Sequence, residues 1–589
     1  MYLRTTQRRN KDGSVVRYVQ VAHNRKVDGV TQAEVLVNLG REDALDRAGL
    51  ARLVASINRY LGTTPDQADV GIPGEQLTVA GSRPMGTVHL LDGLWHTLGV
   101  DDALKRALGP RRFTTDVERV LFALVANRAI DPRSKLSAAE WASCDVTIPG
   151  LTGMDEDQAY RAMDALIDAD AQARVQEAVF FAVAHLLNLE VDVLLFDTTS
   201  TYFERDTEET GDTAFRLYGH SKDHRTDLPQ VVIGLAVTKE GIPVRCWCWP
   251  GNTTDTTVLP QVKDDLRLWR LGRVVTVVDR GFSSEANLAY LKRAGGHYIA
   301  GERMRDGSSL VEAALSRQGR YSQVRDNLRV KEVKLDAAPD RRWVICHNPA
   351  EAERDKTQRD HALEAVQAEL DRIKTLRDKA TATGKTGMTT PKTPAKTNAD
   401  TAGDANPADT TEAKPAPQPA HVKAECALRD HPALGRWVKQ LPTGRLTIDR
   451  AKVTAEERLD GKYLLTTSDP DLSAEDVALG YKNLLEAERG FRDLKSTLEL
   501  RPVYHRLEPR IRAHVLLCWL ALLLIRVAER STGQTWRRIA IELGRIHAVT
   551  LTGTAGTVVH VTPLNTTQAG ILQACKITPP PAVTTLTPA

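Results

Sequence analysis

The sequence predicts an α/β protein in which a mixed sheet flanked by helices is interrupted by a β-rich insertion and preceded by a helical domain and a small N-terminal β region. Three observations predict this fold class. Between 191 and 305 the apolar pattern alternates between strands and helices, as expected of a sheet with helices packed on it. Apolar residues recur at helical spacing before this stretch, from 85 to 189. Later, the segment 381–420 of Thr, Ala, Pro and Lys interrupts the regular patterns.

The elements follow in order along the chain. Val-rich alternating segments split by KDGS and KVDG predict a small β meander up to about residue 42. The helical pattern after it has expected breaks at Gly-Pro and Asp-Pro steps and in TIPGLTG. The stretch 191–305 reads strand, strand, strand, helix, strand, helix, strand. Beyond it, LRVKEVKL, RRWVICHN and GKYLLTTS predict further strands, whereas 381–420 has too few large apolar residues to pack and is expected to be a disordered linker.

These patterns divide the chain into six parts. They are a basic N-terminal β region with a linker (1–80), a helical domain (85–190), the first part of the sheet domain (191–305), an insertion domain containing the linker (306–475), the second part of the sheet domain (476–550) and a C-terminal tail (551–589).

Composition limits the possible functions. The chain has 589 residues, 42% of them hydrophobic and 26% charged, so it can bury several cores as a soluble globular protein. The net charge of only +3 does not by itself indicate a polyanionic partner. Basic residues cluster locally in MYLRTTQRRNKDGSVVRYVQVAHNRK, where the single acid is Asp12. This cluster is either a nucleic-acid surface or a solvated face.

Cysteine usage and hydropathy favour the cytoplasm. The seven cysteines show no CxxC pair that would hold zinc, and their odd number argues against a disulfide framework. We expect no secretory leader, because the N-terminal segment has arginines but no apolar stretch. The apolar run VLLCWLALLLI at 515–525 is shorter than the roughly 20 residues that cross a bilayer. We therefore expect a buried core helix there and no membrane partner.

Two predicted buried strands end in aspartate. VDVLLFD ends at Asp197, and VVTVVD ends at Asp279, which Arg280 and Gly281 follow. Two carboxylates brought together at one sheet edge repel each other unless a cation lies between them. Oxygen ligands of this kind suit Mg²⁺ or Mn²⁺. Taken singly, either aspartate could instead cap a helix or form a salt bridge.

A third acid lies in the later helical stretch YKNLLEAERGFRDLK. Tyr481, Leu485, Glu488, Arg492 and Lys495 follow one another at spacings of four, three, four and three, which places them on one helical face. An amphipathic helix would bury such a stripe as apolar side chains, whereas this stripe is mostly polar and suits contacts with a metal and phosphates. The alternative is an ordinary surface pair of Glu488 with Arg492.

At these residues the sequence resembles the DDE transposases of the IS4 superfamily, and most closely its IS1634-like branch. The resemblance covers most of the chain and rests on NLGRED, NRAIDPRSKLSAAEW, FDTTSTYFE, YGHSKDHRTDLPQVVIGLAVTKEGIPV, GNTTD, VVDRGF, DGKYLLTTSDP and AERGFRDLK…RPVYH. The superfamily's last motif is Tyr, two residues, Arg, three residues, Glu, six residues, Lys. Tyr481, Glu488 and Lys495 keep this spacing, but Leu484 stands where Arg is expected, and Lys482 or Arg492 could replace that contact.

The resemblance implies an RNase H-like catalytic domain formed by 191–305 and 476–550. It implies that two Mg²⁺ or Mn²⁺ ions activate water, and later a DNA 3′-OH, for attack on a phosphodiester. The catalytic residues and metal ligands would be Asp197, Asp279 and Glu488. The residues expected to contact DNA are Tyr481, Arg492, Lys495, Lys222 and Arg280.

The implied function is that of an insertion-sequence transposase. It would bind double-stranded DNA at terminal inverted repeats and at the target, acting by cut-and-paste as a homodimer in the synaptic complex, in the cytoplasm and on the nucleoid. The basic N-terminal region and the helical domain are expected to recognise the ends. Two alternatives remain: a catalytically inactive DNA-binding protein derived from a transposase, and a metal-dependent nuclease without strand transfer. The intact acids argue against the first, and only a strand-transfer assay separates the second.

Overall fold

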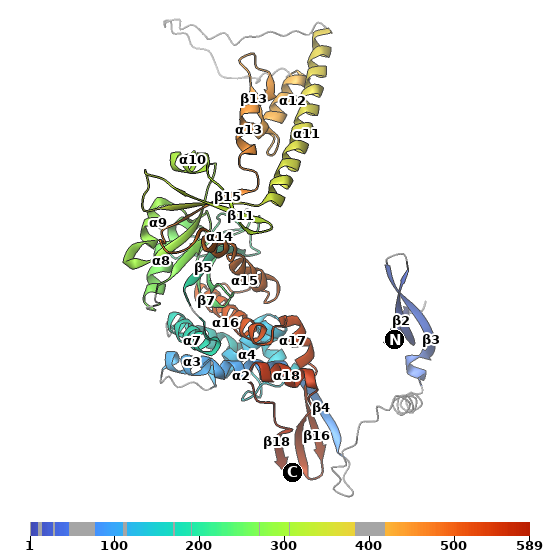
Figure 1. Ribbon diagram of the computed structural model, residues 1–589. Coiled ribbons are helices and arrows are strands. Elements are labelled where there is room, and N and C mark those ends of the chain that lie inside the picture. The colour runs from blue at the N-terminus through green and yellow to red at the C-terminus, as the bar shows by residue number, and fades with distance from the viewer. Residues whose placement is uncertain are drawn as a thin grey trace, which may run out of the picture. The chain divides into compact units, whose positions relative to one another are not determined.

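The computed structural model describes residues 2–9, 15–27, 30–45, 77–109, 115–168, 171–189, 191–269, 271, 273–305, 307–382 and 419–588 (Figure 1). The chain forms two compact units. One consists mainly of the N-terminal residues up to Thr78, and the other of Val79–Leu551 with Thr557–Pro588.

The N-terminal unit contains the predicted β meander. Strands β1 (Tyr2–Arg9), β2 (Val15–Val27) and β3 (Val30–Arg41) pair antiparallel in the order β1-β2-β3 and are followed by a 3-10 turn, Glu42–Ala44. Val19 and Ala22 of the central strand are buried, whereas Arg8, Arg9 and Arg17 are exposed. The basic side chains are therefore accessible on this sheet.

The second unit is organised around a large mixed sheet, and the element order predicted for 191–305 is confirmed. The elements are β5 (Val193–Tyr202), β6 (Gln230–Thr238), β7 (Pro243–Pro250), α8 (Asp255–Arg267), β8 (Val275–Val278), α9 (Glu285–Leu291), a 3-10 turn (Arg293–Gly295) and β9 (His297–Glu302). In the sheet these strands lie in the order β7-β6-β5-β8-β9. Strands β5, β6 and β7 pair antiparallel, and β5, β8 and β9 pair parallel.

Helices cover both faces of this sheet. Leu194 and Phe196 of β5 belong to a cluster with α8 and α9, whereas Leu195 belongs to the main core with α14 (Ala474–Lys482), α15 (Leu485–Ser496) and α16 (Glu508–Thr532). Successive side chains of a strand point to opposite faces. All nine residues of β6 are buried, and as expected of a strand covered on both faces, it is polar only at its two ends, Gln230 and Thr238.

The structure corrects the prediction of a separate β-rich insertion domain over 306–475. Strands β10 (Ser322–Arg325), β11 (Leu328–Lys334), β12 (Arg342–His347) and β15 (Lys462–Thr467) extend the same sheet beyond β9, and α10 (Ser309–Ser316) packs on them. Strands β11, β12 and β15 have apolar residues on both faces, so they can be buried within a larger sheet, whereas β10 is the exposed edge strand. Sequence pattern alone does not distinguish that from a sheet of their own.

The part of the insertion that leaves the sheet is mainly helical. It consists of α11 (Pro349–Ala382), α12 (Ala420–Arg429), a 3-10 turn (Gly435–Trp437), the ribbon β13 (Val438–Gln440) and β14 (Leu446–Ile448), and α13 (Arg450–Glu457). Val366 of α11 packs with Trp437 and Val453 in a small core. The predicted disordered linker 381–420 lies almost entirely outside the described residues, since only its ends belong to α11 and α12.

The helical domain predicted for 85–190 does not have a core of its own. Its elements are α2 (Gly86–Thr97), α3 (Val100–Leu108), α4 (Val117–Ile130), α5 (Lys135–Glu140), a π-helical turn (Trp141–Asp145), α6 (Glu156–Asp168) and α7 (Ala171–Leu187). Helix α16 packs against α4 and α6, and one buried cluster joins all three. This shared core is why the helices fold together with the sheet.

Helix α16 is longer than its apolar run, and by length and composition it could cross a membrane. However, 94% of its most apolar window is buried inside the protein. The predicted buried core helix is confirmed, although its length of 25 residues exceeds that of the apolar run from which it was predicted.

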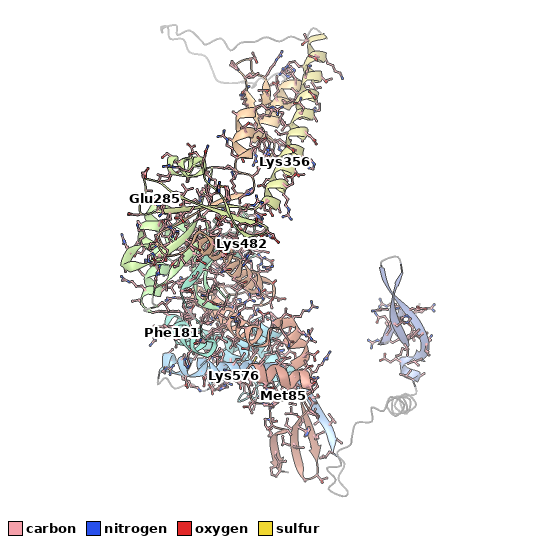
Figure 2. The ribbon with its side chains drawn as sticks, viewed as in Figure 1. Met85, Phe181, Glu285, Lys356, Lys482 and Lys576 are labelled. Atoms are coloured by element: carbon pink, nitrogen blue, oxygen red, sulfur yellow. The ribbon has the colours of Figure 1, made fainter. Side chains whose placement is uncertain are left out.

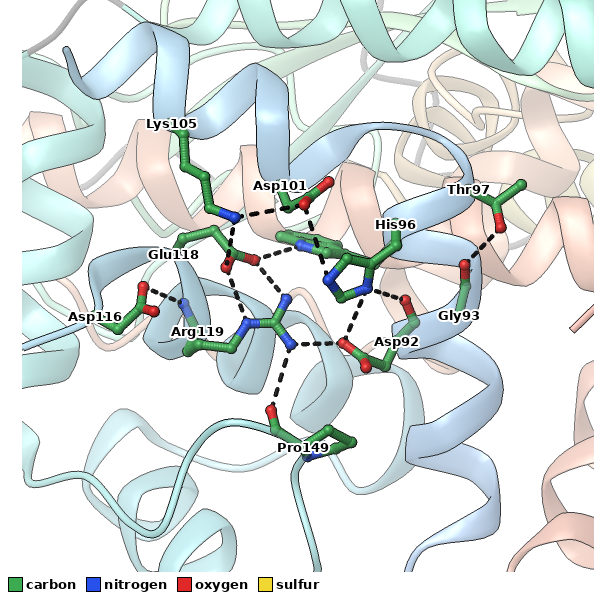
Figure 3. A network of polar contacts seen from close by, with 11 residues as sticks. Asp92, Gly93, His96, Thr97, Asp101, Lys105, Asp116, Glu118, Arg119 and Pro149 are labelled. Carbon is green, nitrogen blue, oxygen red and sulfur yellow. Dashed lines mark hydrogen bonds and ion pairs between the residues drawn. The ribbon is translucent and has the colours of Figure 1, made fainter. Parts of the chain in front are cut away.

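A buried polar network ties α2 to α4 (Figure 3). The Arg119 guanidinium pairs with Asp92 and Glu118 at 2.6 Å each, and Trp95 Nε1 donates to Glu118 Oε1 at 2.6 Å. Burial alone would lower the pKa of Arg119, but its hydrogen bonds to the two acids raise it. Because breaking a buried pair leaves an uncompensated charge, this network fixes how the two helices pack.

The C-terminal tail predicted over 551–589 is wrong, because these residues fold. Strands β16 (His547–Gly553), β17 (Gly556–Val561) and β18 (Val583–Pro588) form a four-stranded sheet with β4 (Thr78–Pro84), in the order β18-β17-β16-β4. Helices α17 (Trp536–Leu543) and α18 (Thr566–Ala574) contact each other beside it. The Thr-rich composition suggested a tail, but alternating Val and Thr also form strands.

Candidate active site

Asp197 and Asp279 lie side by side in the large sheet. Strand β5 continues past Asp197 to Tyr202, so the prediction that the strand ends at this acid is wrong. The parallel neighbour β8 does end here, at Val278, which pairs with Phe196. The residue that follows each member of this pair is an aspartate, Asp197 or Asp279. The prediction that these two aspartates come together in one sheet is therefore confirmed.

Both aspartates face the side of the sheet that α14 and α15 cover. Leu195 and Val277 each lie two residues before an aspartate, and both belong to the core on that side. The Tyr481 hydroxyl, at the end of α14, donates to Asp279 Oδ1 at 2.6 Å, which confirms the direction for Asp279.

Burial and neighbouring acids shift the pKa of Asp197. Its side chain is 19% exposed. Burial and the charges of Asp279 and Asp255 raise the pKa of Asp197, while Lys222 and the Thr198 amide oppose the rise, and the net result is a pKa of about 6. The Thr198 amide donates to Asp197 Oδ1 at 2.7 Å. A group with this environment favours a cation beside it.

Sequence reasoning missed Asp255 as a third acid of the site, although its motif GNTTD was part of the family resemblance. Asp255 is the first residue of α8. Its Oδ1 accepts a hydrogen bond from the Thr198 hydroxyl at 2.5 Å, and its Oδ2 lies 3.3 Å from Lys222 Nζ. Apart from that motif, the signal was an acid at a helix start, a position that usually indicates a cap.

Lys222 brings a cation to these acids. Its Nζ lies 3.7 Å from Asp197 Oδ1, and it donates to the Thr198 carbonyl at 2.7 Å and to the Thr198 hydroxyl at 2.6 Å. Predicted as a DNA contact, Lys222 is thus engaged inside the acidic site. Its ammonium group supplies a positive charge between the Asp197 and Asp255 carboxylates.

A pocket of about 390 Å³ opens at this edge of the sheet. The side chains and glycine that line it are mostly hydroxyl-bearing or charged: Thr199, Ser200, His220, Lys222, Val232, Thr253, Thr254, Asp255, Thr256, Asp279, Arg280, Gly281 and Arg303. Both signs of charge are present in one polar cleft, as expected where anionic oxygens and a cation meet.

A glycine in β9 makes room for Tyr481. A Cβ at Gly301 would lie 2.5 Å from the Tyr481 hydroxyl oxygen and 3.0 Å from the ring carbon that bears it. Gly301 follows Ala300, the partner of Val278, so it lies level with Asp279. Burial and the Asp279 charge raise the pKa of Tyr481, so its hydroxyl stays a proton donor to this carboxylate.

Glu488 lies on the helix that packs over these acids but does not touch them. It is exposed on α15, and no hydrogen bond or ion pair of its side chain occurs among the described residues. Within the part of the chain that the structure describes, no three acidic, histidine or cysteine side chains form a group able to hold a metal. The predicted triad is therefore not closed in this conformation.

The placement of α15 nevertheless brings Glu488 towards Asp197. A Cβ at Gly490 would lie 2.8 Å from Leu235 Cδ2, so the glycine allows the helix to approach β6 closely. Leu235 is the cross-strand partner of Asp197. Seven residues before and after Glu488, Tyr481 contacts Asp279 and Lys495 pairs with Asp223, the neighbour of Lys222.

The other predicted contacts vary in their environment. Arg280 and Arg492 are exposed, and Arg280 lines the pocket. Leu484, which replaces the family's arginine, is buried in the main core with 6% of its surface exposed. Lys482 ends α14 and is partly buried (Figure 2). Of the two replacements expected for the missing arginine, Arg492 is therefore the more accessible.

Two models of known protein families match the chain. The model of the transposase DDE domain matches residues 192–524, which contain all four acids of the site region. The model of the N-terminal domain of IS1634 family transposases matches residues 3–69. The chain belongs to the IS1634 family of DDE transposases.

Other comparisons add little about this transposase. A cryo-EM structure of a piggyBac transposase synaptic complex with hairpin DNA is similar at 8% identity, covering 79% of this chain and 82% of that chain with a TM-score of 0.35. A likeness at that level carries no argument about the site. The search of curated proteins gave no match.

The donor atoms of the transposase site are of the kind that bind a divalent cation, although in this conformation they do not gather around one point. Asp197 and Asp279 supply adjacent carboxylates, Asp255 supplies a third one nearby, and an ammonium already lies among them. Hard oxygen donors of this kind are typical ligands of Mg²⁺ and Mn²⁺. Hydroxyl groups of Thr199, Ser200 and Thr253 line the pocket beside Asp255 and Asp279.

Proposed function

We propose that this transposase binds double-stranded DNA at the terminal inverted repeats of an insertion sequence and cuts and joins DNA with the help of two Mg²⁺ or Mn²⁺ ions, moving the element by cut-and-paste. The observation that carries the proposal is the register of β5 and β8, which places Asp197 beside Asp279 on the face covered by the helix of Glu488. An RNase H-like fold for this catalytic domain is part of the proposal, supported by the strand order β7-β6-β5-β8-β9.

Asp197, Asp279 and Glu488 would hold the ions. Such ions, when bound, supply an activated oxygen nucleophile and stabilise the leaving oxygen of a phosphodiester. Tyr481 orients Asp279 by its 2.6 Å hydrogen bond, and Lys222 keeps Asp197 and Asp255 compensated until the site is filled. Glu488 must approach the two aspartates, so we propose that DNA or metal binding draws the α15 side chain into the site.

Basic side chains would bind the DNA around this site. Arg280 and Arg492 are exposed and able to meet backbone phosphates, and the exposed arginines of the N-terminal sheet are able to bind the element's ends together with the helices of 85–190. We propose a homodimer in the synaptic complex, acting in the cytoplasm and on the nucleoid.

Strand transfer tests this proposal. The purified protein is incubated with Mg²⁺, a duplex that carries the repeats flanking its gene with a free 3′-OH, and a supercoiled target plasmid. Covalent joining of the duplex to the plasmid is the expected result, with Asp279→Asn as the inactive control. A catalytically inactive DNA-binding protein would bind the duplex and yield no product. A nuclease would nick the plasmid without joining, and either result would overturn the proposal.

A further inference from the structure

Asp223 is a carboxylate held by two cations. It lies in the segment between β5 and β6, and its side chain is 13% exposed. Its Oδ1 lies 2.8 Å from Lys495 Nζ, and its Oδ2 lies 2.7 Å from the Arg501 guanidinium. Lys495 comes from α15, and Arg501 comes from the loop that follows this helix. One anionic side chain thus joins the segment between β5 and β6 to α15 and to the loop that directly follows this helix.

The two cations are built into the fold rather than loosely exposed. Lys495 has 15% of its side chain exposed and Arg501 has 30%. The Arg501 guanidinium lies over the Tyr202 ring at 5.2 Å from its centroid. Tyr202 is the last residue of β5, the strand that carries Asp197. The ring therefore orients the guanidinium at the edge of the catalytic strand.

The pair of cations adjoins the acidic site. Lys222, the residue next to Asp223, has its Nζ 3.7 Å from Asp197 Oδ1. Consecutive Cα atoms are about 3.8 Å apart, so Asp223 lies one residue away from the lysine whose ammonium group reaches Asp197. An anion bound in place of the Asp223 carboxylate would therefore lie close to the DNA strand that is cleaved in the proposed function.

We propose that Lys495 and Arg501 form a binding site for a DNA backbone phosphate, and that the Asp223 carboxylate occupies the phosphate's place while DNA is absent. Arginine and lysine bind carboxylate and phosphate oxygens with the same charge-assisted hydrogen bonds. This inference rests on the proposed function and adds Arg501 and Asp223 to it. On DNA binding a phosphate displaces the Asp223 carboxylate, so part of the attraction between DNA and the two cations is spent on that displacement.

A phosphate site and a merely structural role for Asp223 predict opposite changes in DNA affinity when Asp223 is replaced. If Asp223 competes with phosphate, Asp223→Asn frees two cations and tightens DNA binding. If Asp223 only supports the fold, the same change disorders Lys495 and Arg501 and weakens binding. Each additional phosphate contact also steepens the fall of log affinity with log salt by about 0.9.

The test measures the affinity of the full-length protein for two fluorescent duplexes by anisotropy over a series of salt concentrations. One duplex carries the repeats that flank the gene, and the other has an unrelated sequence. We expect Asp223→Asn to bind both duplexes about tenfold more tightly at low salt, with a steeper salt dependence. Asp227→Asn is the matched control, because Asp227 is 62% exposed and pairs with Arg225, which also lies over Tyr202 at 5.1 Å. Since exposed pairs contribute little, that control should change affinity far less.

A second variant keeps the test decisive if Asp223→Asn folds poorly. Arg501→Gln should weaken binding of both duplexes and make the salt dependence shallower, and its loss of affinity should be larger in the Asp223→Asn background. Unchanged or weaker binding by a well-folded Asp223→Asn protein, or an Arg501→Gln protein with wild-type affinity and salt dependence, would overturn the phosphate site. Failure of the wild-type protein to bind either duplex would instead overturn the proposed function itself.

Discussion

Among the three predicted metal ligands, Glu488 is the one whose side chain must move furthest to reach the site. It is exposed on α15 and touches neither aspartate, but the helix that carries it packs on the face where both aspartates point. Helix α15 approaches β6 closely at Gly490, opposite the strand position of Asp197. The side chain is thus free to move while its backbone is fixed.

We predict that Glu488→Gln removes at least a hundredfold of the DNA cleavage rate, while binding of the element's ends stays close to wild type. The amide keeps the size of the side chain but loses the charge that would hold a divalent ion. Glu486→Gln is the matched control, since Glu486 lies on the same helix and pairs with Arg489 at 3.8 Å. Single-turnover cleavage of a labelled end compares the three proteins, and wild-type rates for Glu488→Gln would remove this acid from the site.

Two buried histidines should make the stability of the fold depend on pH. Burial and the charges of Lys135, Arg128 and Arg510 together lower the pKa of His505 to about 3, against an opposing effect of Asp164. The His514 ring packs 5.3 Å from it, and burial lowers the pKa of His514 as well. Since the folded pKa lies below the unfolded value near 6.5, this histidine's contribution to stability is present above pH 6.5 and is lost as the pH falls towards 3.

His505→Phe should therefore reduce the acid sensitivity of the fold. Between pH 6.5 and pH 5 the wild-type histidine alone lowers the free energy of unfolding by about 2 kcal/mol, because each pH unit between the unfolded and folded pKa values is worth about 1.4 kcal/mol. Thermal melts at pH 7 and pH 5 should show a smaller fall in Tm for the variant. Exposed His560→Asn serves as the control, and equal falls for wild type and His505→Phe would contradict a buried neutral imidazole.

At the scale of elements, the insertion leaves and re-enters the sheet at one point. His347 of β12 pairs with Lys462 of β15, and the Asn348 amide donates to the Gly461 carbonyl at 2.7 Å. Joining Asn348 directly to Gly461 would create an Asn-Gly loop between two paired strand residues. Asn-Gly is the preferred sequence of a two-residue type I′ hairpin turn.

We predict that a protein lacking 349–460 keeps the large sheet as a β12–β15 hairpin. Its Tm should fall by only a few degrees, because the lost contacts, such as the Arg359–Asp460 and Arg305–Glu456 pairs, lie at the base of the insertion. Hydrogen exchange of the β12 and β15 amides measures whether the sheet survives, with removal of 383–418 alone as the control. Loss of cooperative unfolding in the larger deletion would show that the insertion is part of the folding core.

Local patterns predicted elements well where a single period dominated. The strand and helix order of 191–305 and the meander at the N-terminus followed from apolar spacing and turn residues. The sheet extension by β10, β11, β12 and β15 did not, because strands that are apolar on both faces fit either one large sheet or two small ones. The C-terminal strands were missed because a Thr-rich segment resembles a tail until its partner β4, far away in sequence, is known.

The site shows the same division. Asp197 and Asp279 were predictable because each follows buried apolar strand residues, and the position of Glu488 followed from the family's spacing. Asp255 and Asp223 were not, because their roles arise from contacts with Thr198, Lys222, Lys495 and Arg501 that no local pattern encodes. Register between distant segments decides which acids meet.

At the scale of the whole molecule, the catalytic sheet and the helical region share one core. Helix α16 packs against α4, α6 and β7, so the helices of 85–190 are held directly on the catalytic domain. Contact between α15 and the sheet is part of the same core. A change in α15 on DNA binding would therefore reach both the acids and the helical region.

The most direct test of the account is metal-dependent cleavage by the acids that the sheet aligns. A supercoiled plasmid carrying the element with both ends is incubated with wild type, Asp197→Ala or Asp279→Ala, in Mg²⁺ or in EDTA, and end binding is measured in parallel. Wild type should cleave at the ends only in Mg²⁺, and neither variant should cleave although both still bind the ends. Cleavage by either variant at the wild-type rate, or wild-type cleavage in EDTA, would contradict a metal site at Asp197 and Asp279.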